Sequence, residues 1–214
     1  MMEIKSISVF GVDVGSVKKG NFGWCKAVIN SEENSVYSSF SINELTKSIS
    51  FDLDSGMKVA LGFECPLTVN LADKPEDLTS ARKGEGDRAW CAGAGCGALA
   101  VGLVECAWIL KRIRENASCR IIPTLDWNSF MNSEDNLFLW EAFVSSKAKG
   151  KSHEEDAIIS VLSFYDAYPQ ITSASAVRNQ TPYSLIGAAL LRSGLSEDVN
   201  ILSQDCIVIK AGEK

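Results

Sequence analysis

The sequence has 214 residues, of which 46% are hydrophobic and 22% are charged, and its formal net charge is −6. This composition fits one large globular domain and excludes a disordered or fibrous chain. The acidic balance argues against a protein that coats nucleic acid through bulk positive charge, although carboxylates gathered to hold a metal ion also add negative charge.

The cysteines and the hydropathy of the sequence indicate where in the cell the protein is located. The seven cysteines are scattered, and none has the C-x-x-C spacing of a zinc ribbon or a redox motif, so we expect free thiols in a reducing cytoplasm. The N-terminus lacks the layout of a signal peptide. The longest apolar stretch, Gly93 to Leu110, is interrupted by Glu105, and we expect a buried helix there and no membrane association.

Three successive strands are predicted in the first 42 residues by β-branched residues and by alternation of apolar with polar side chains. We place them at Ile4 to Val14, Phe22 to Asn30 and Ser35 to Ile42. Polar turns at Gly15 to Asn21 and Ser31 to Asn34 separate them. Such tight connections favour antiparallel pairing of the three strands.

A short helix, a buried strand and an irregular insertion follow. Asn43 is a suitable N-cap for a helix that ends near Ile49. Lys58 to Cys65 is a continuous apolar run stopped by Pro66, as expected for a central strand buried on both faces. Residues 67–95 are rich in Gly, Asp and Lys, and an irregular segment of this length indicates a functional or a mobile loop.

The second half of the sequence alternates helices with strands. We predict helices over Gly97 to Asn116, from the capping box of Ser152 and Glu155 to Pro169, and over Pro182 to Arg192. We predict strands at Cys119 to Ile122, Leu137 to Val144 and Cys206 to Lys210. The whole order predicts a single α/β domain over residues 1–214, with a mixed central sheet flanked by helices and a C-terminal helix–strand extension.

Three carboxylates lie where burial is expensive unless the charge is paired or bound to a metal. Asp13 lies within the first strand (FGVDVGS), Glu64 ends the buried strand (LGFECP), and Asp156 begins a helix (SHEEDAIIS) with His153 on the same face. Taken singly, each also suits a loop cap, a strand end or a partner for the helix dipole. Taken together, they form an oxygen-rich set of the kind that binds Mg²⁺.

The segments GVDVGSVKKGNFGW, LGFECP and SHEEDAIISVLSFYDAY resemble the three active-site segments of the ribonuclease H-like superfamily. The most similar group is the family of predicted RNase H-like nucleases, and RuvC-type Holliday-junction resolvases are similar at a greater distance. The matched segments cover about a fifth of the chain. The resemblance implies a ribonuclease H-like fold and a nuclease that uses two Mg²⁺ or Mn²⁺ ions to hydrolyse phosphodiester bonds.

The resemblance also implies roles for individual residues. It places metal ligation on Asp13, Glu64 and Asp156, and His153 matches the histidine three residues ahead of the last carboxylate. Our hypothesis is that Asp13 bridges the two ions, with Glu64 and Asp156 each holding one side, and that His153 ligates a metal or orients the attacking water. The implied partner is nucleic acid, and a homodimer is compatible with the sequence. Candidate phosphate contacts are Lys18, Lys19, Arg88, Lys149 and Lys151, with Arg82, Lys83 and Lys147 nearby. A solvated surface explains any one of these basic residues equally well.

Other interpretations stay open. The pattern G-x-D-x-G in the first strand also fits the first phosphate loop of actin, Hsp70 and sugar-kinase ATPases, although those proteins pair two such domains. A non-catalytic ribonuclease H-like module would bind a protein or a nucleic acid without metal ions. A cysteine-based enzyme would have to pair Cys65 with His153, because the chain has one histidine.

Overall fold

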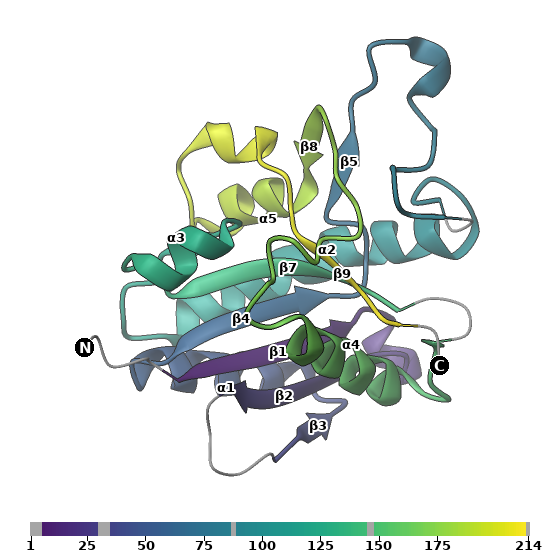
Figure 1. The fold of residues 1–214 in the computed structure, drawn as a ribbon. Coiled ribbons are helices and arrows are strands. Elements are labelled where there is room, and N and C mark those ends of the chain that lie inside the picture. The colour runs from purple at the N-terminus through teal and green to yellow at the C-terminus, as the bar shows by residue number, and fades with distance from the viewer. Residues whose placement is uncertain (1–5, 30–34, 87–88, 145–147, 213–214) are drawn as a thin grey trace.

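A computed structural model describes residues 6–29, 35–86, 89–144 and 148–212 (Figure 1). Four sequence predictions fall outside the described residues: the first residues of the strand that begins at Ile4, the turn from Ser31 to Asn34, and the phosphate contacts assigned to Arg88 and Lys147. The chain forms a central mixed sheet with helices on both faces, which confirms the predicted α/β class.

The central sheet has seven strands in the order β3-β2-β1-β4-β7-β6, with β9 paired to β7 beyond this path. The first three strands pair antiparallel, and β4, β6, β7 and β9 are parallel to their neighbours, as predicted. The strands are β1 (Ile7–Asp13), β2 (Gly23–Ile29), β3 (Tyr37–Ser39), β4 (Lys58–Phe63), β6 (Pro123–Thr124), β7 (Leu137–Phe143) and β9 (Val208–Lys210).

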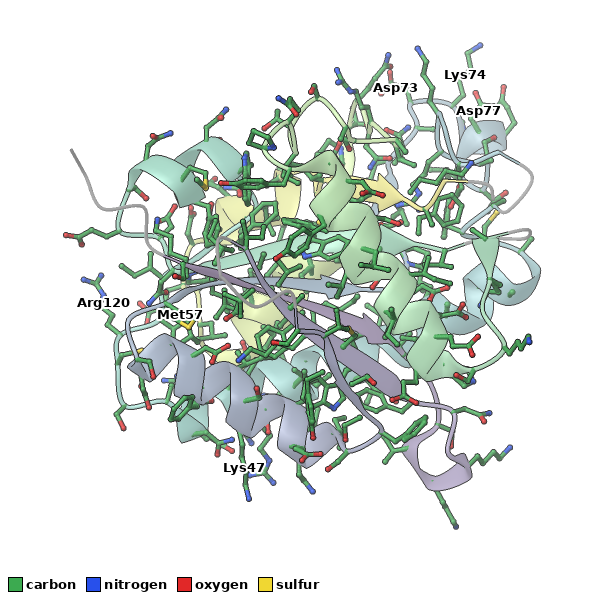
Figure 2. All side chains as sticks on the ribbon, turned by 60° about the horizontal axis from the view of Figure 1, so that its bottom comes forward. Lys47, Met57, Asp73, Lys74, Asp77 and Arg120 are labelled. Atoms are coloured by element: carbon green, nitrogen blue, oxygen red, sulfur yellow. The ribbon has the colours of Figure 1, made fainter. Side chains whose placement is uncertain are left out.

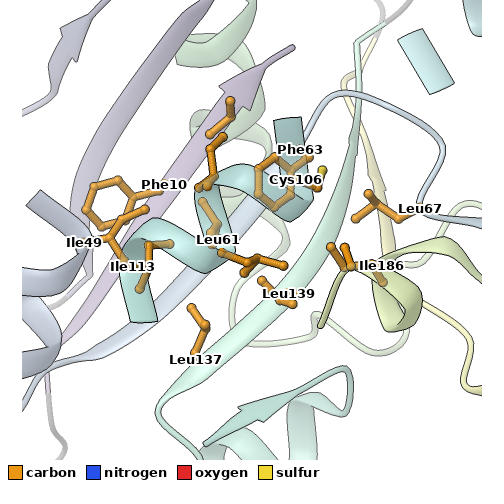
Figure 3. Packing of buried hydrophobic residues seen from close by; sticks show 14 of the residues in the cluster. Phe10, Ile49, Leu61, Phe63, Leu67, Cys106, Ile113, Leu137, Leu139 and Ile186 are labelled. Atoms are coloured by element: carbon orange, nitrogen blue, oxygen red, sulfur yellow. The ribbon is translucent and has the colours of Figure 1, made fainter. Parts of the chain in front are cut away.

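Both faces of the central strands are buried, because helices cover each of them. One face packs against α1 (Ile42–Asp54), α2 (Gly93–Asn116) and α5 (Leu185–Ser193), and the other packs against α3 (Trp127–Asn132) and α4 (His153–Ala167). The first of these clusters includes the residues labelled in Figure 3, namely Phe10, Leu61, Phe63, Leu137 and Leu139 of the sheet, Ile49, Cys106, Ile113 and Ile186 of the helices, and Leu67 after β4. This two-sided packing explains why Lys58 to Cys65 is an uninterrupted apolar run.

The insertion predicted at residues 67–95 has some regular structure. It contains β5 (Thr68–Asn70) and the 3₁₀ turn η2 (Pro75–Asp77), and β5 pairs antiparallel with β8 (Pro182–Ser184) in a small separate sheet. Its outer end carries charged side chains, and Figure 2 shows Asp73, Lys74 and Asp77 there. The C-terminal extension consists of α5, the 3₁₀ helix η4 (Val199–Ser203) and β9, which returns to the central sheet.

The start of α1 differs from the prediction. The N-cap is Ser41, whose hydroxyl accepts a hydrogen bond from the Glu44 amide at 3.2 Å, and the prediction of Asn43 was wrong. Ser41 and Glu44 have the S-x-x-E spacing of a capping box. The predicted third strand therefore ends early, and the helix continues past Ile49 to Asp54.

Two further predictions were wrong, and one helix was not predicted. Residues 119–122 form no strand, and the parallel pairing with β7 falls instead on β6. The Asp126 side chain caps α3, a helix that was not predicted. Pro182 begins β8 and not a helix, because the segment pairs with β5, and the hydroxyl of Ser184 then caps α5 by accepting the Gly187 amide hydrogen at 3.1 Å.

The helix α2 is buried in only one of its halves. Its C-terminal half packs into the core through residues such as Cys106 and Ile109, whereas Val101, Leu103 and Val104 are exposed. The prediction of a buried helix was therefore wrong for the N-terminal half. Among the described residues, α2 alone is long and apolar enough to cross a membrane, and 22% of its most apolar window is buried. This is weak evidence for a span, because core helices of soluble proteins pass the same test.

Candidate metal centre

Two carboxylates meet because β1 and β4 are adjacent parallel strands. Asp13 is the last residue of β1, and Glu64 follows the last residue of β4, where its amide still donates a hydrogen bond to the Val12 carbonyl at 2.7 Å. Parallel strands end at the same edge of a sheet, so the two side chains lie side by side. Asp156 joins them from the first turn of α4, and ligand atoms of all three lie within 4.8 Å of one another.

Two glycines allow α4 to lie close enough for Asp156 to reach the strand ends. A Cβ atom on Gly11 would lie 2.9 Å from the Ala157 carbonyl oxygen, and one on Gly23 would lie 2.7 Å from the Glu154 amide nitrogen. Gly23 is also the register partner of Asp13. The absence of these side chains therefore seats the first turns of the helix directly over the end of β1.

At the start of α4, Glu155 takes part in the helix cap, whereas Asp156 takes part in the carboxylate cluster. The Ser152 hydroxyl accepts the Glu155 amide hydrogen at 3.2 Å, and the Glu155 carboxylate accepts the Lys151 amide hydrogen at 2.6 Å. These bonds occupy Glu155 in the cap. Asp156 instead faces the cluster, buried to 4% exposure, with one carboxylate oxygen accepting the Gly150 amide hydrogen at 2.7 Å.

Two basic side chains contact the cluster. Nδ1 of His153 lies against Oδ2 of Asp13 in a short contact. Nζ of Lys149 lies 3.2 Å from Oδ2 of Asp156 and 3.4 Å from Oε1 of Glu64. His153 and Asp13 were predicted from the sequence to belong to one site, and the fold brings them into contact.

Burial of the cluster changes the pKa of Glu64 and of Asp13. Burial, together with the charges of Asp13 and Asp156, raises the pKa of Glu64 to about 9 against the attraction of Lys149. Burial also raises the pKa of Asp13, and His153 opposes that rise. The Oε2 atom of Glu64 is buried without a hydrogen-bond partner in the described part of the chain. A divalent cation would satisfy this oxygen and offset the repulsion, so the donor set fits a hard metal ion.

The cluster opens into a pocket of about 440 Å³. Its lining includes Asp13, Glu64, Lys149 and His153, with Lys19 at the turn after β1. The insertion contributes Arg82 and Glu85, and α2 contributes the small residues Ala94, Gly95, Gly97 and Ala98. This volume falls within the range of small-molecule binding sites. The pocket lies beside the carboxylates of Asp13 and Glu64.

The predicted phosphate contacts are distributed unevenly. Lys19 and Lys149 line the pocket, whereas Lys18 and Lys151 are exposed on segments next to it, the 3₁₀ turn η1 (Val17–Lys19) and the residues before α4. Arg82 is not available for phosphate. It is buried, and its guanidinium pairs with two carboxylates, which are Glu85 at 3.0 Å and Glu141 at 2.6 Å.

Sequence reasoning missed three acidic residues around the pocket. Glu141 and Glu85 line it and pair with Arg82, and Glu105 of α2 accepts the Gly15 amide hydrogen at 3.1 Å, two residues after Asp13. Glu141 was detectable, because it is a lone carboxylate in the apolar strand sequence LFLWEAF, and the same cost of burial that singled out Asp13 applies to it.

The thiols of the chain are free, as predicted: all seven cysteines lie in the described part and form no disulfide. A hydrogen bond with Cys106 and complete burial raise the pKa of Cys65 well above the ordinary thiol value. A thiol of that kind is a poor nucleophile, which argues against a cysteine-based enzyme at this pocket.

Comparison of the chain with protein-family models, with curated proteins and with solved structures found no match. The chemistry of the site therefore has to be inferred from its own geometry.

Proposed function

We propose that this protein is a metal-dependent nuclease that hydrolyses phosphodiester bonds. The observation that carries the proposal is the convergence of Asp13, Glu64 and Asp156, which are up to 143 positions apart in the chain and have ligand atoms within 4.8 Å of one another. Buried carboxylates that repel one another are destabilising unless a cation joins them. A cluster of hard oxygen ligands beside an open pocket is the arrangement that Mg²⁺ or Mn²⁺ uses in phosphoryl chemistry.

We assign the fold to the ribonuclease H-like kind. The support is topological: three antiparallel strands, a helix, a strand parallel to β1, a second helix and a further parallel strand, with a late helix on the opposite face. The sequence segments that resemble that superfamily are the ones that meet at the cluster. Each of the three carboxylates therefore has both a topological and a sequence reason for its position.

The residues of the cluster and of the pocket would have different roles in the hydrolysis. When bound, divalent ions supply an activated water and stabilise the leaving oxygen. Asp13, Glu64 and Asp156 would hold these ions, with Asp13 as the shared ligand. His153 contacts the Asp13 carboxylate and is partly exposed at the pocket, where it would ligate a metal ion or orient the attacking water. Lys19 and Lys149 line the same pocket and offer positive charge to a phosphate.

The partner and the compartment follow from the same observations. We infer a nucleic acid that contacts the protein locally, at the pocket, because the net charge of −6 opposes a broad electrostatic interface. We infer a cytoplasmic location, because seven free thiols are typical of a reducing environment.

The test combines metal binding with cleavage. We expect Mn²⁺ to raise the melting temperature of the wild-type protein and to support cleavage of a labelled oligonucleotide. Asp13→Asn and Asp156→Asn should lose both effects. Asp166→Asn is the matched control, because Asp166 is an exposed carboxylate on the same helix as Asp156. Equal stabilisation of all four proteins by Mn²⁺ would contradict a metal site at the cluster.

Two further results would redirect the assignment. Stabilisation by ATP with Mg²⁺, without any cleavage of oligonucleotides, would favour the ATPase interpretation. Stabilisation by Mn²⁺ that Asp13→Asn abolishes, together with no hydrolysis of DNA or RNA, would leave a metal-binding module without nuclease activity.

A further inference from the structure

Lys149 occupies the position of a cation in the cluster. Its ammonium nitrogen lies 3.2 Å from Asp156 and 3.4 Å from Glu64, so it pairs with two of the three carboxylates that would bind a metal. The contact is built into the partly buried edge of the site, because the Asp156 and Glu64 side chains are 6% and 11% exposed. The neighbouring Lys151 is exposed and forms no ion pair with the described residues.

An ammonium group and a divalent ion cannot both occupy this place. A metal ion binds carboxylate oxygens at about 2.0 to 2.6 Å. The oxygens involved lie within 4.8 Å of one another, so any ion bound by all three carboxylates sits within a few ångströms of the atoms that Lys149 contacts. Like charges at such separation in a partly buried site repel strongly. Binding of the metal must therefore displace the ammonium group.

The Lys149 side chain has room to move away from the carboxylates. The Lys149 side chain is 39% exposed, and the residue also lines the pocket, so the four-carbon stem can turn toward the pocket while the backbone stays in place. Lys19 lies on the same pocket. A freed ammonium group beside Lys19 would double the positive charge offered to a phosphate there.

We propose that Lys149 is an internal counter-ion that a divalent metal displaces, so that metal binding releases this lysine to hold the phosphate of the substrate. The inference rests on the proposed metal-dependent function and adds an order of events to it. Without metal, Lys149 lowers the repulsion among the carboxylates and competes for the site. With metal bound, the same residue becomes a substrate contact.

The first test measures Mn²⁺ affinity, by the electron paramagnetic resonance signal of the free ion. Lys149→Met should bind Mn²⁺ about tenfold more tightly than wild type, because the competing charge is gone. Lys151→Met is the matched control and should bind like wild type. If the wild-type protein binds no Mn²⁺, the metal site itself is wrong. If wild type binds Mn²⁺ and Lys149→Met binds it equally or more weakly, only the counter-ion role is wrong.

The second test uses the unaltered protein and does not depend on the folding of a variant. Acetic anhydride modifies neutral, accessible amines, and mass spectrometry reads the extent of modification at each lysine. Adding Mn²⁺ should increase the labelling rate of Lys149 several-fold, because the amine leaves its contacts with Asp156 and Glu64 and becomes accessible in the pocket. The rate at Lys151 should not change. An unchanged or slower rate at Lys149 under saturating Mn²⁺ would overturn the proposal.

Discussion

Arg82 shows how a single residue fixes the insertion to the sheet. Its guanidinium donates to Glu141 on β7, to Glu85 within the insertion and to the carbonyl of Thr68 on β5. All three charged side chains are 1% or 2% exposed. The pairing thus links the wall of the pocket to the strand behind it, and it explains why a basic residue in a glycine-rich loop is not a phosphate contact.

Replacing Arg82 should lower the free energy of unfolding substantially. Arg82→Met leaves two buried carboxylates without their cation, and we expect the free energy of unfolding to fall by about 3 to 5 kcal/mol. The measurement is urea denaturation followed by tryptophan fluorescence. Lys83→Met is the matched control, because Lys83 is the exposed neighbour, and it should change stability by less than about 0.5 kcal/mol. Similar values for the two variants would show that the pairing contributes little.

At the scale of elements, the site depends on how closely α4 approaches β1. Gly11→Ala places a Cβ 2.1 Å from the Ser160 hydroxyl and 2.9 Å from the Ala157 carbonyl oxygen. The hydroxyl can rotate away, but the backbone oxygen can move only with the helix. We expect a loss of about 1 to 3 kcal/mol in unfolding free energy and a weaker affinity for Mn²⁺, because the shift carries Asp156 away from Asp13.

The control for this prediction is another glycine-to-alanine change. Gly97 lies in α2, and a Cβ there meets no atom within 4 Å. Gly97→Ala should raise stability by up to about 1 kcal/mol, because alanine is the better helix former. Calorimetric melting and titration with Mn²⁺ measure both variants. Unchanged metal affinity in Gly11→Ala would mean that the helix position does not set the geometry of the cluster.

The elements differ in how far the sequence predicts them. The strand that ends at Asp13, the strand that ends just before Glu64 and the helix that carries Asp156 have long apolar patterns or caps. The adjacency of the two strands follows from parallel pairing. The strands β5, β6 and β8 are two or three residues long, and they are strands only because a distant segment pairs with them. The sequence of a short strand does not indicate which other segment will pair with it. The role of Arg82 was hidden for the same reason, since Glu141 lies 59 positions away.

At the scale of the whole molecule, the positive charge that matters is local. The chain carries 21 basic and 27 acidic residues, yet Lys19 and Lys149 line the pocket beside the metal cluster, and Lys18 and Lys151 lie on the adjoining segments. Lys47, by contrast, lies on α1, away from the pocket. Figure 2 shows Lys47 projecting from α1 on the outer surface of the molecule. Binding of nucleic acid should therefore involve few phosphates.

A small number of phosphate contacts predicts that the affinity for nucleic acid depends only weakly on salt concentration. For a single-stranded oligonucleotide, each phosphate contact contributes about −0.7 to the slope of log K against log salt. Four lysines limit the slope to about −3, whereas a protein that coats nucleic acid gives a much steeper value. The measurement is fluorescence anisotropy in Ca²⁺, an oxygen-preferring ion used here in place of Mg²⁺ to slow cleavage. Lys19→Met should reduce the magnitude of the slope by about 0.7, and Lys47→Met should leave it unchanged. A steep slope, or equal effects of the two substitutions, would mean that the pocket is not where the strand binds.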